Sequence, residues 1–224
     1  MPGSIKIDDG SGNYTILTNA GSLGSDKTIT IPNETATLAT TTATDLGGLV
    51  KLTSATASSS SELLFDDFVD TSTYSSYYIA VDNIIPATNN VNFRVVFRTG
   101  GASGADKTGT YARGYAYNYL ETASSSSGAR ANYTDYGVLA DNVGNAGGSV
   151  HALQAIGQFF PGNGTNSTAI IQMPLTQRQS SGSVVGYYQN AIIVENLYAA
   201  TGLRFYLGSG DIASGSIHIF GVKK

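Results

Sequence analysis

The chain has 224 residues, no cysteine and a net charge of −4, with a sequence pI near 5.0. The lack of cysteine excludes disulfides and thiolate metal sites, and the acidic balance provides no basic surface for nucleic acid. Only 12% of the residues are charged, about half of the roughly 25% that is typical, so solubility must rest on hydroxyl, amide and backbone groups. No apolar run approaches the ~18 residues of a membrane span, and the start, MPGSIKIDDGSG, lacks the apolar core of a signal peptide. We therefore expect no nucleic-acid partner and no membrane insertion.

Residues 1–61 form a first zone with little apolar material. Its aliphatic patches are residues 14–17 and 29–31, Tyr14 is its one aromatic residue, and it ends in the linker-like run LTSATASSSS at residues 52–61. So small an apolar surface does not offset roughly 1–2 kcal/mol of backbone entropy per ordered residue. We predict an extended N-terminal β or arm segment, residues 1–61, that becomes ordered only within an assembly.

Residues 62–224 form a second zone in which short strand patterns follow one another. VNFRVVFR (91–98), YARGYAYNY (111–119), LRFYL (203–207) and GSIHIFGV (215–222) alternate with period two, and Gly-, Ser- and Asn-rich turns separate them. The one helical signal is weak: SELLFDDFVD (61–70) would place Leu64, Phe65 and Phe68 on one side of a short helix. Regularly spaced short strands predict an all-β fold, an antiparallel β-sandwich of the jelly-roll type over residues 62–224.

Tyrosines gather on one face of a single predicted strand. Residues 111–119 place four tyrosines on one face and Ala112, Gly114 and Ala116 on the other, and two more tyrosines follow a Ser-rich loop. Tyrosine combines an apolar ring with a polar tip and suits interfaces and sugar stacking. Because the opposite face is too slight to fill a core, we favour core or subunit packing over recognition of a surface ligand. The residues concerned are Tyr111, Tyr115, Tyr117, Tyr119, Tyr133 and Tyr136.

The sequence offers little catalytic chemistry. Its two histidines are His151 and His218, and no Gly-x-Ser-x-Gly elbow is present. The acidic cluster Asp66, Asp67 and Asp70 does not follow the EF-hand pattern, and the loop at 101–109 lies between two strands, unlike a phosphate-binding loop. A hydrolytic triad could be drawn only from Ser149, His151 and Asp135 or Asp141, with nothing to fix it. We expect no catalytic residue, no metal and no cofactor, and thus a protein that is not an enzyme.

The first zone resembles the repeated shaft segments of tail fibres and related virion proteins of bacteriophages. The resemblance is carried by Thr28-Ile29-Thr30-Ile31-Pro32 and by Glu34-Thr35-Ala36-Thr37-Leu38-Ala39-Thr40. The second zone is similar, mainly in texture, to C-terminal β-domains of marine phage and cyanophage structural proteins, through residues 193–197 and 215–223. The resemblance implies homotrimers. Three copies around an axis would pool a row of apolar side chains, with candidate assembly residues Ile16, Leu17, Ile29, Ile31 and Leu38.

Three functions are compatible with these patterns. The favoured one is a tail fibre or receptor-binding subunit that attaches to other virion proteins through residues 1–61 and touches bacterial surface polysaccharide. The alternative is a capsid decoration protein, a cement or head fibre, whose arm clamps capsid subunits. A polysaccharide depolymerase is the third hypothesis, and we disfavour it because such enzymes usually need longer chains. For the first two functions we expect a virion location after assembly in the host cytoplasm.

Overall fold

The structure is a computed structural model that describes residues 4–8, 14–18, 48–119, 125–145, 152–178 and 185–224. The chain divides into two units, Met1–Leu46 and Gly47–Lys224. In the first unit, strands β1 (Ser4–Asp8) and β2 (Tyr14–Thr18) form an antiparallel hairpin in which Ser4 lies opposite Thr18. The second unit contains all the other strands and a hydrophobic core of its own.

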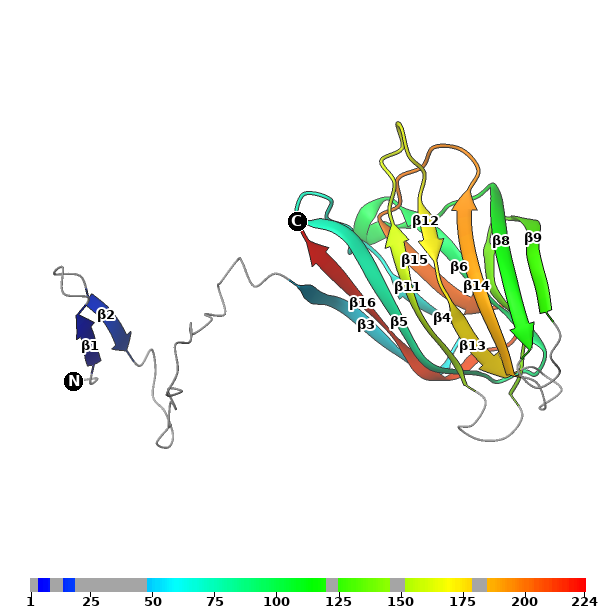
Figure 1. Ribbon diagram of the computed structural model, residues 1–224, viewed down its shortest axis with the longest axis horizontal. Coiled ribbons are helices and arrows are strands. Elements are labelled where there is room, and N and C mark those ends of the chain that lie inside the picture. Colours follow the sequence, from blue (N-terminus) through cyan, green and yellow to red (C-terminus); the bar gives the residue numbers. More distant parts are fainter. Residues whose placement is uncertain (1–3, 9–13, 19–47, 120–124, 146–151, 179–184) are drawn as a thin grey trace. The chain divides into compact units, whose positions relative to one another are not determined.

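The second unit is a sandwich of two antiparallel sheets, which confirms the predicted all-β class (Figure 1). The five-stranded sheet has the order β10-β6-β15-β4, with β7 paired to β6, and the nine-stranded sheet has the order β3-β16-β5-β11-β12-β14-β8-β9, with β13 between β11 and β14. The strands of the smaller sheet are β4 (Glu62–Phe65), β6 (Val91–Thr99), β7 (Ala105–Asp106), β10 (Gly137–Val143) and β15 (Gly202–Leu207). Those of the larger sheet are β3 (Leu49–Ser60), β5 (Tyr74–Pro86), β8 (Thr110–Tyr119), β9 (Ser125–Thr134), β11 (Leu153–Phe160), β12 (Ile170–Gln172), β13 (Leu175–Arg178), β14 (Val185–Val194) and β16 (Ile212–Lys223).

Eight of these strands have the connectivity of a jelly roll. In chain order they are β3, β4, β5, β6, β10, β11, β15 and β16. The larger sheet contains four of them in the order β3-β16-β5-β11, which are the first, eighth, third and sixth. The smaller sheet contains the other four in the order β4-β15-β6-β10, which are the second, seventh, fourth and fifth. This is the strand order of two interleaved Greek keys, the arrangement of the eight-stranded jelly roll.

The other long strands widen the larger sheet beyond β11. Strands β12 and β13 share one position between β11 and β14, and Pro174, which has no N–H to donate, lies where they are interrupted. Strands β14, β8 and β9 then continue the sheet outward. The inner face of this extension packs on β10, the edge strand of the smaller sheet, and Gly137 allows the close approach: a Cβ there would lie 2.5 Å from Cγ2 of Ile192.

The core lies between the sheets and follows the alternation read from the sequence. In β11 the side chains are buried at every second position from Leu153 to Phe159. Aromatic rings join the two sheets, with Phe97 5.9 Å from Phe159 and 5.6 Å from Tyr111 between ring centroids. Such pairs add to the hydrophobic gain from burial, so this aromatic layer fixes how the sheets face each other.

Two expectations about the start of this unit are wrong. The run at 52–61 is not a linker, because Leu49–Ser60 form strand β3, which pairs with β16 from Leu49 opposite Val222 to Ser60 opposite Ile212. A polar strand is stable there because one neighbour satisfies its backbone and its Thr and Ser side chains can face water. Residues 62–65 are strand β4 rather than a helix, with Leu63 and Phe65 buried and Leu64 43% exposed, which is period two.

The compact unit therefore begins at Gly47 rather than at residue 62. The prediction that residues 1–61 order only within an assembly is wrong for β3, which is ordered by its own chain. A truncation that is meant to remove the first zone should stop at residue 46, because removal through residue 60 would also delete β3. Of the candidate assembly residues, Ile16 and Leu17 belong to β2, and Ile29, Ile31 and Leu38 lie outside the described residues.

The contact of β10 with β14 predicts opposite effects for two glycines. Gly137→Ala would force a methyl group against the buried Ile192 side chain, and we expect it to lower the free energy of unfolding by about 1–3 kcal/mol. Gly114, in strand β8 beside β14, has no atom within 4 Å of the position that a Cβ would take, so Gly114→Ala should be neutral or slightly stabilising. Urea unfolding followed by tyrosine fluorescence would measure both, and an equal loss in the two variants would contradict this packing.

Candidate functional site

The predicted tyrosine face points inward, toward β10 and the other sheet. Tyr111 is fully buried; its hydroxyl donates to the Lys107 carbonyl at 2.9 Å and accepts from the Phe97 N–H at 3.2 Å. Burial raises the pKa of Tyr111 well above its ordinary value. The other described tyrosines of the group are half-buried, and the side chain of Tyr119 lies outside the described residues. The half-buried residues are Tyr115, Tyr117, Tyr133 and Tyr136.

A buried arginine lies at the centre of this tyrosine group. Arg113 has no exposed surface, and its guanidinium contacts Asp141 at 2.5 Å, donates to Oδ1 of Asn190 at 2.9 Å and stacks 4.2 Å from the Tyr115 ring. These partners connect β8 with β10 and β14. A buried charge is tolerated only when it is paired and hydrogen-bonded. This cluster therefore has a structural role: it joins the inner face of the sheet extension to β10. The sequence placed Arg113 on the tyrosine face and gave no sign of its partners.

The outer face of the five-stranded sheet carries charged residues that form ion pairs with one another. Arg98 contacts Asp66 at 2.6 Å and Asp106 at 2.5 Å, and the hydrogen bond to Asp66 raises the pKa of the arginine. Arg204 joins the same network through Asp106 at 2.6 Å and Glu62 at 3.0 Å. Because most of its charges already have partners within the chain, this face has little to offer a charged ligand.

The acidic cluster is divided among structural roles. Asp66 belongs to the arginine network, and Asp67 has a positive φ of 55° in the connection between β4 and β5. Oδ1 of Asp70 accepts hydrogen bonds from the Ser72 N–H at 2.9 Å, the Ser72 hydroxyl at 2.5 Å and the Thr73 N–H at 3.3 Å. Within the described residues, no three His, Cys, Asp or Glu side chains gather in a way that could hold a metal ion.

The two acids considered for the candidate triad have other partners in the described part of the chain. Asp141 pairs with Arg113, Asp135 accepts from the Gly109 N–H at 2.7 Å, and Ser149 and His151 lie outside the described residues. His218, on β16, has its Nε2 3.2 Å from the Ser216 hydroxyl. The structure shows no carboxylate hydrogen-bonded to this described pair, so nothing in these contacts would orient His218 as a general base.

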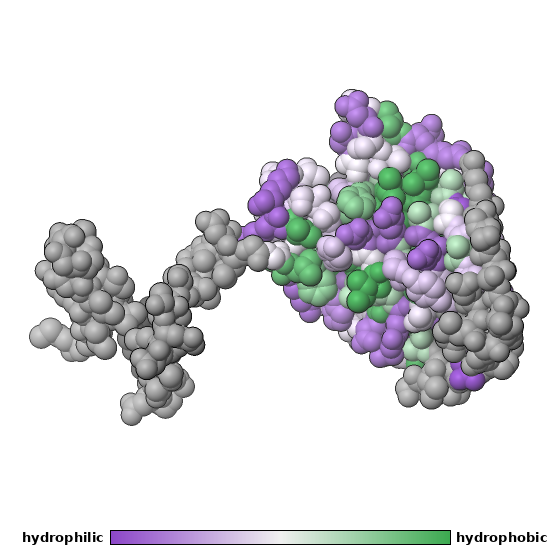
Figure 2. Space-filling model, viewed as in Figure 1, coloured by the Kyte–Doolittle hydropathy of each residue, from purple (hydrophilic) through white to green (hydrophobic). Residues whose placement is uncertain are grey.

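The outer face of the nine-stranded sheet is different, because it is grooved and few charged residues line the groove. Figure 2 shows polar and apolar residues intermingled over this side of the molecule. Three shallow depressions of about 560, 660 and 530 Å³ adjoin one another across β5, β11, β13, β14 and β8. The first two share Pro174 and Tyr187, and the second and third share Gly114 and Ala191. Together they form one continuous channel, which we call the sheet groove.

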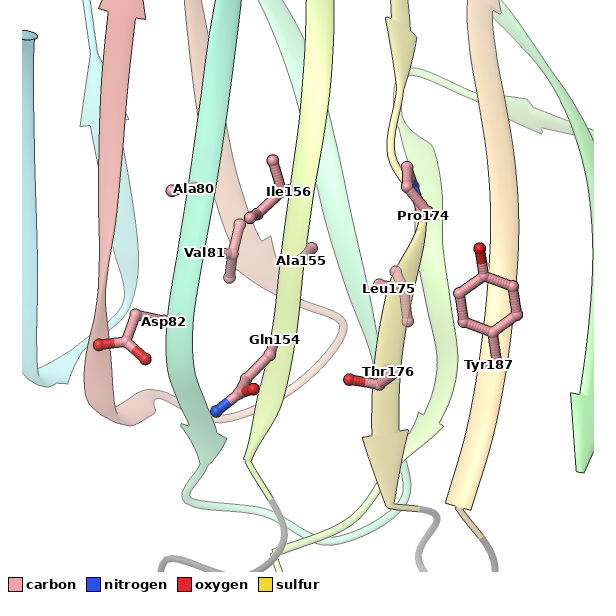
Figure 3. Close-up of a pocket in the computed structure, with 10 residues that line it drawn as sticks. All are labelled: Ala80, Val81, Asp82, Gln154, Ala155, Ile156, Pro174, Leu175, Thr176 and Tyr187. Atoms are coloured by element: carbon pink, nitrogen blue, oxygen red, sulfur yellow. The ribbon is translucent and has the colours of Figure 1, made fainter. Parts of the chain in front are cut away.

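Small residues form the floor of the sheet groove and longer side chains form its sides. The floor contains Ala80, Ala112, Gly114, Ala116 and Ala191. Figure 3 shows Gln154 and Ile156 on β11 and Tyr187 on β14 beside the first depression. Ile156 is 67% exposed, and Gln172 and Gln189 present further amides along the channel. The residues read from the sequence as too slight to fill a core, Ala112, Gly114 and Ala116, are thus the floor of an external channel.

Comparison of the chain with protein-family models, curated proteins and solved structures finds no match in any of the three. In the part of the chain that the structure describes, no helix has the length and hydropathy needed to cross a membrane. Function must therefore be inferred from the sheet groove, the two contrasting faces and the sequence patterns of the first unit.

The buried ion pair predicts a stability cost that an exposed pair does not have. Asp141→Asn would leave Arg113 buried without its counter-charge, and we expect a loss of about 1–3 kcal/mol, less than the roughly 3–5 kcal/mol of a fully buried pair because the Asp141 side chain is 31% exposed. Glu62→Gln, which removes a more exposed partner of Arg204, should cost less than about 1 kcal/mol. Chemical unfolding of both variants measures the difference, and equal losses would show that Arg113 does not depend on Asp141.

The Asp70 turn predicts a dependence of stability on acid pH. The hydrogen bonds from Ser72 and Thr73 lower the pKa of Asp70 from 3.8 to about 2. Because the folded pKa is below the unfolded one, the contribution of Asp70 is fully present above about pH 4 and is lost as the pH falls through about 2. We expect the difference in Tm between the native chain and Asp70→Asn to be largest at about pH 5–7 and to shrink below about pH 4. A difference that stays constant from about pH 7 to about pH 2 would count against this assignment.

Proposed function

We propose that this chain is a virion structural protein of a bacteriophage, acting as a tail fibre or receptor-binding subunit. In this proposal the first unit, Met1–Leu46, attaches the protein to other virion proteins and assembles it as a homotrimer. The jelly-roll unit, residues 47–224, is presented outward to the bacterial surface. The protein acts by binding and is not an enzyme.

The observation that carries the proposal is the contrast between the two outer faces of the jelly roll. One face holds arginines and acids that are paired with each other, as in the contacts of Arg98 with Asp66 and Asp106. The other is a wide sheet with a groove along it that few charged residues line. A concave surface with a few polar groups is the usual form of a binding site, and a jelly roll is a frequent scaffold in viral capsid and lectin domains.

The sequence of the first unit supports attachment. Thr28-Ile29-Thr30-Ile31-Pro32 and the run that follows have the shaft-like pattern, and they precede the globular unit in the chain. An all-β globular unit that follows such a segment fits a fibre subunit that attaches at one end and binds at the other. Fold alone does not determine function, so the proposal depends on the combination of this pattern with the grooved face.

Immunogold electron microscopy of the virions of the phage that encodes the chain tests the proposal. Antibodies raised against residues 47–224 should label the tail or its fibres, and mass spectrometry of the purified virions should detect the chain. Label on the head would instead support the alternative of a capsid decoration protein. Absence of the chain from purified virions would overturn both assignments.

A further inference from the structure

We propose that the sheet groove binds an uncharged polysaccharide, with the glycan chain lying across strands β11, β13, β14 and β8. The inference deepens the proposed function and rests on it, since it names the ligand class that the outward-facing unit would meet on a bacterium. It also moves the recognition surface from the tyrosines of β8, which point inward, to the opposite face of the same strand.

The shape of the groove favours a long ligand. Because the three depressions share lining residues, they form a channel rather than separate pockets. Its floor reaches the backbone beside Gly114, where no atom of the described neighbouring residues lies within 4 Å of the position that a Cβ would take. A polymer can lie in such an open channel and contact several strands, whereas a small ligand would bury little of its surface there.

The charge of the groove favours a neutral ligand. Charged residues in its lining are few: Asp82 at one end, Glu195 at the other, and Arg113, whose side chain points to the inner side and pairs with Asp141. An anionic polysaccharide would meet two carboxylates and no free cation among these lining residues. A neutral glycan meets no such repulsion, so electrostatic complementarity selects it.

The side chains of the groove match the groups of a sugar. The side-chain amide of Gln172 makes no hydrogen bond within the described residues, and this exposed group can both donate to and accept from hydroxyl groups. Tyr187 offers a half-buried ring against which the C–H face of a pyranose can pack, with its hydroxyl at the edge. Pro174 adds a rigid apolar surface between them.

A second copy of this chain is the competing occupant, and the two occupants differ in what they need from the face. The lining exposes more apolar than polar surface, as subunit interfaces also do. Among the groove-lining residues, however, Ile156 is the one large apolar side chain that is strongly exposed, whereas amides and hydroxyls recur along the channel. A glycan can use such polar groups along its whole length, and the mass measurement below distinguishes the two occupants.

Affinity electrophoresis of the full-length protein tests the inference, in native gels that contain dextran, mannan, starch or a mixed-linkage β-glucan, and alginate as the anionic comparison. We expect at least one neutral polymer to slow migration and alginate not to do so. Gly114→Trp places a large ring in the open channel and should weaken retention by at least about tenfold. Tyr187→Ala and Gln172→Ala should each weaken it several-fold. Leu197→Trp, at a 54% exposed residue outside the groove lining, is the matched control and should bind normally.

Folding and assembly are measured for the same variants. Far-UV circular dichroism and light scattering should show that Gly114→Trp keeps the fold and the oligomeric mass of the native protein. Absence of retention by all four neutral polymers, stronger retention by alginate, or unchanged retention of Gly114→Trp would overturn the inference. A change of mass in Gly114→Trp would identify the groove as a subunit interface and would also overturn it. Virion labelling decides the proposed function separately, because a chain located on the tail that retains no glycan refutes only the groove assignment.

Discussion

The organisation of this protein follows from a mismatch in width between its two sheets. The nine-stranded sheet extends past the five-stranded sheet that covers it. The inner face of β14, β8 and β9 therefore packs mainly on the edge strand β10, and Tyr111 of β8 also reaches Phe97 of β6. An aliphatic surface there would meet water along its margin. Half-buried tyrosines solve the problem, because their rings cover apolar surface and their hydroxyls reach solvent. Arg113, buried and paired with Asp141, joins this margin to β10.

The same mismatch gives the protein its two unlike faces. Covering the extension from the inside requires the large side chains of β8 to point inward, which leaves Ala112, Gly114 and Ala116 for the outside. The outer surface of the wide sheet is therefore low and open at this position. On the other side of the sandwich, β6, β15 and β4 place Arg98, Arg204 and Glu62 within one ion-pair network. One face thus pairs most of its charges within the chain, whereas the other retains hydrogen-bonding groups that a ligand could use.

Period-two alternation made much of the sandwich predictable, and the misses have physical reasons. Strands such as β6 and β11 carry a strong apolar row, so their existence and their buried faces follow from local sequence. Strand β3 has no such row; it is a strand because β16 lies beside it, which is a non-local fact. Strand β4 is so short that two apolar positions fit a helix as well as a strand. The Arg98 network and the sheet groove depend on pairings between strands far apart in the chain, which spacing within one strand does not reveal.

Strand β3 also shows what a polar alternating segment needs in order to be stable. It is rich in Thr and Ser and contains few apolar residues, yet it is ordered within its own globular unit. What a polar alternating segment needs is an adjacent strand to complete its backbone hydrogen bonds and one thin apolar row to set its register; a thick core of its own is not required. Residues 28–40 have the same kind of alternation with a stronger row, formed by Ile29, Ile31 and Leu38. By this reasoning a strand of that sequence pattern would pair with a neighbouring strand edge, which the proposed homotrimer would supply.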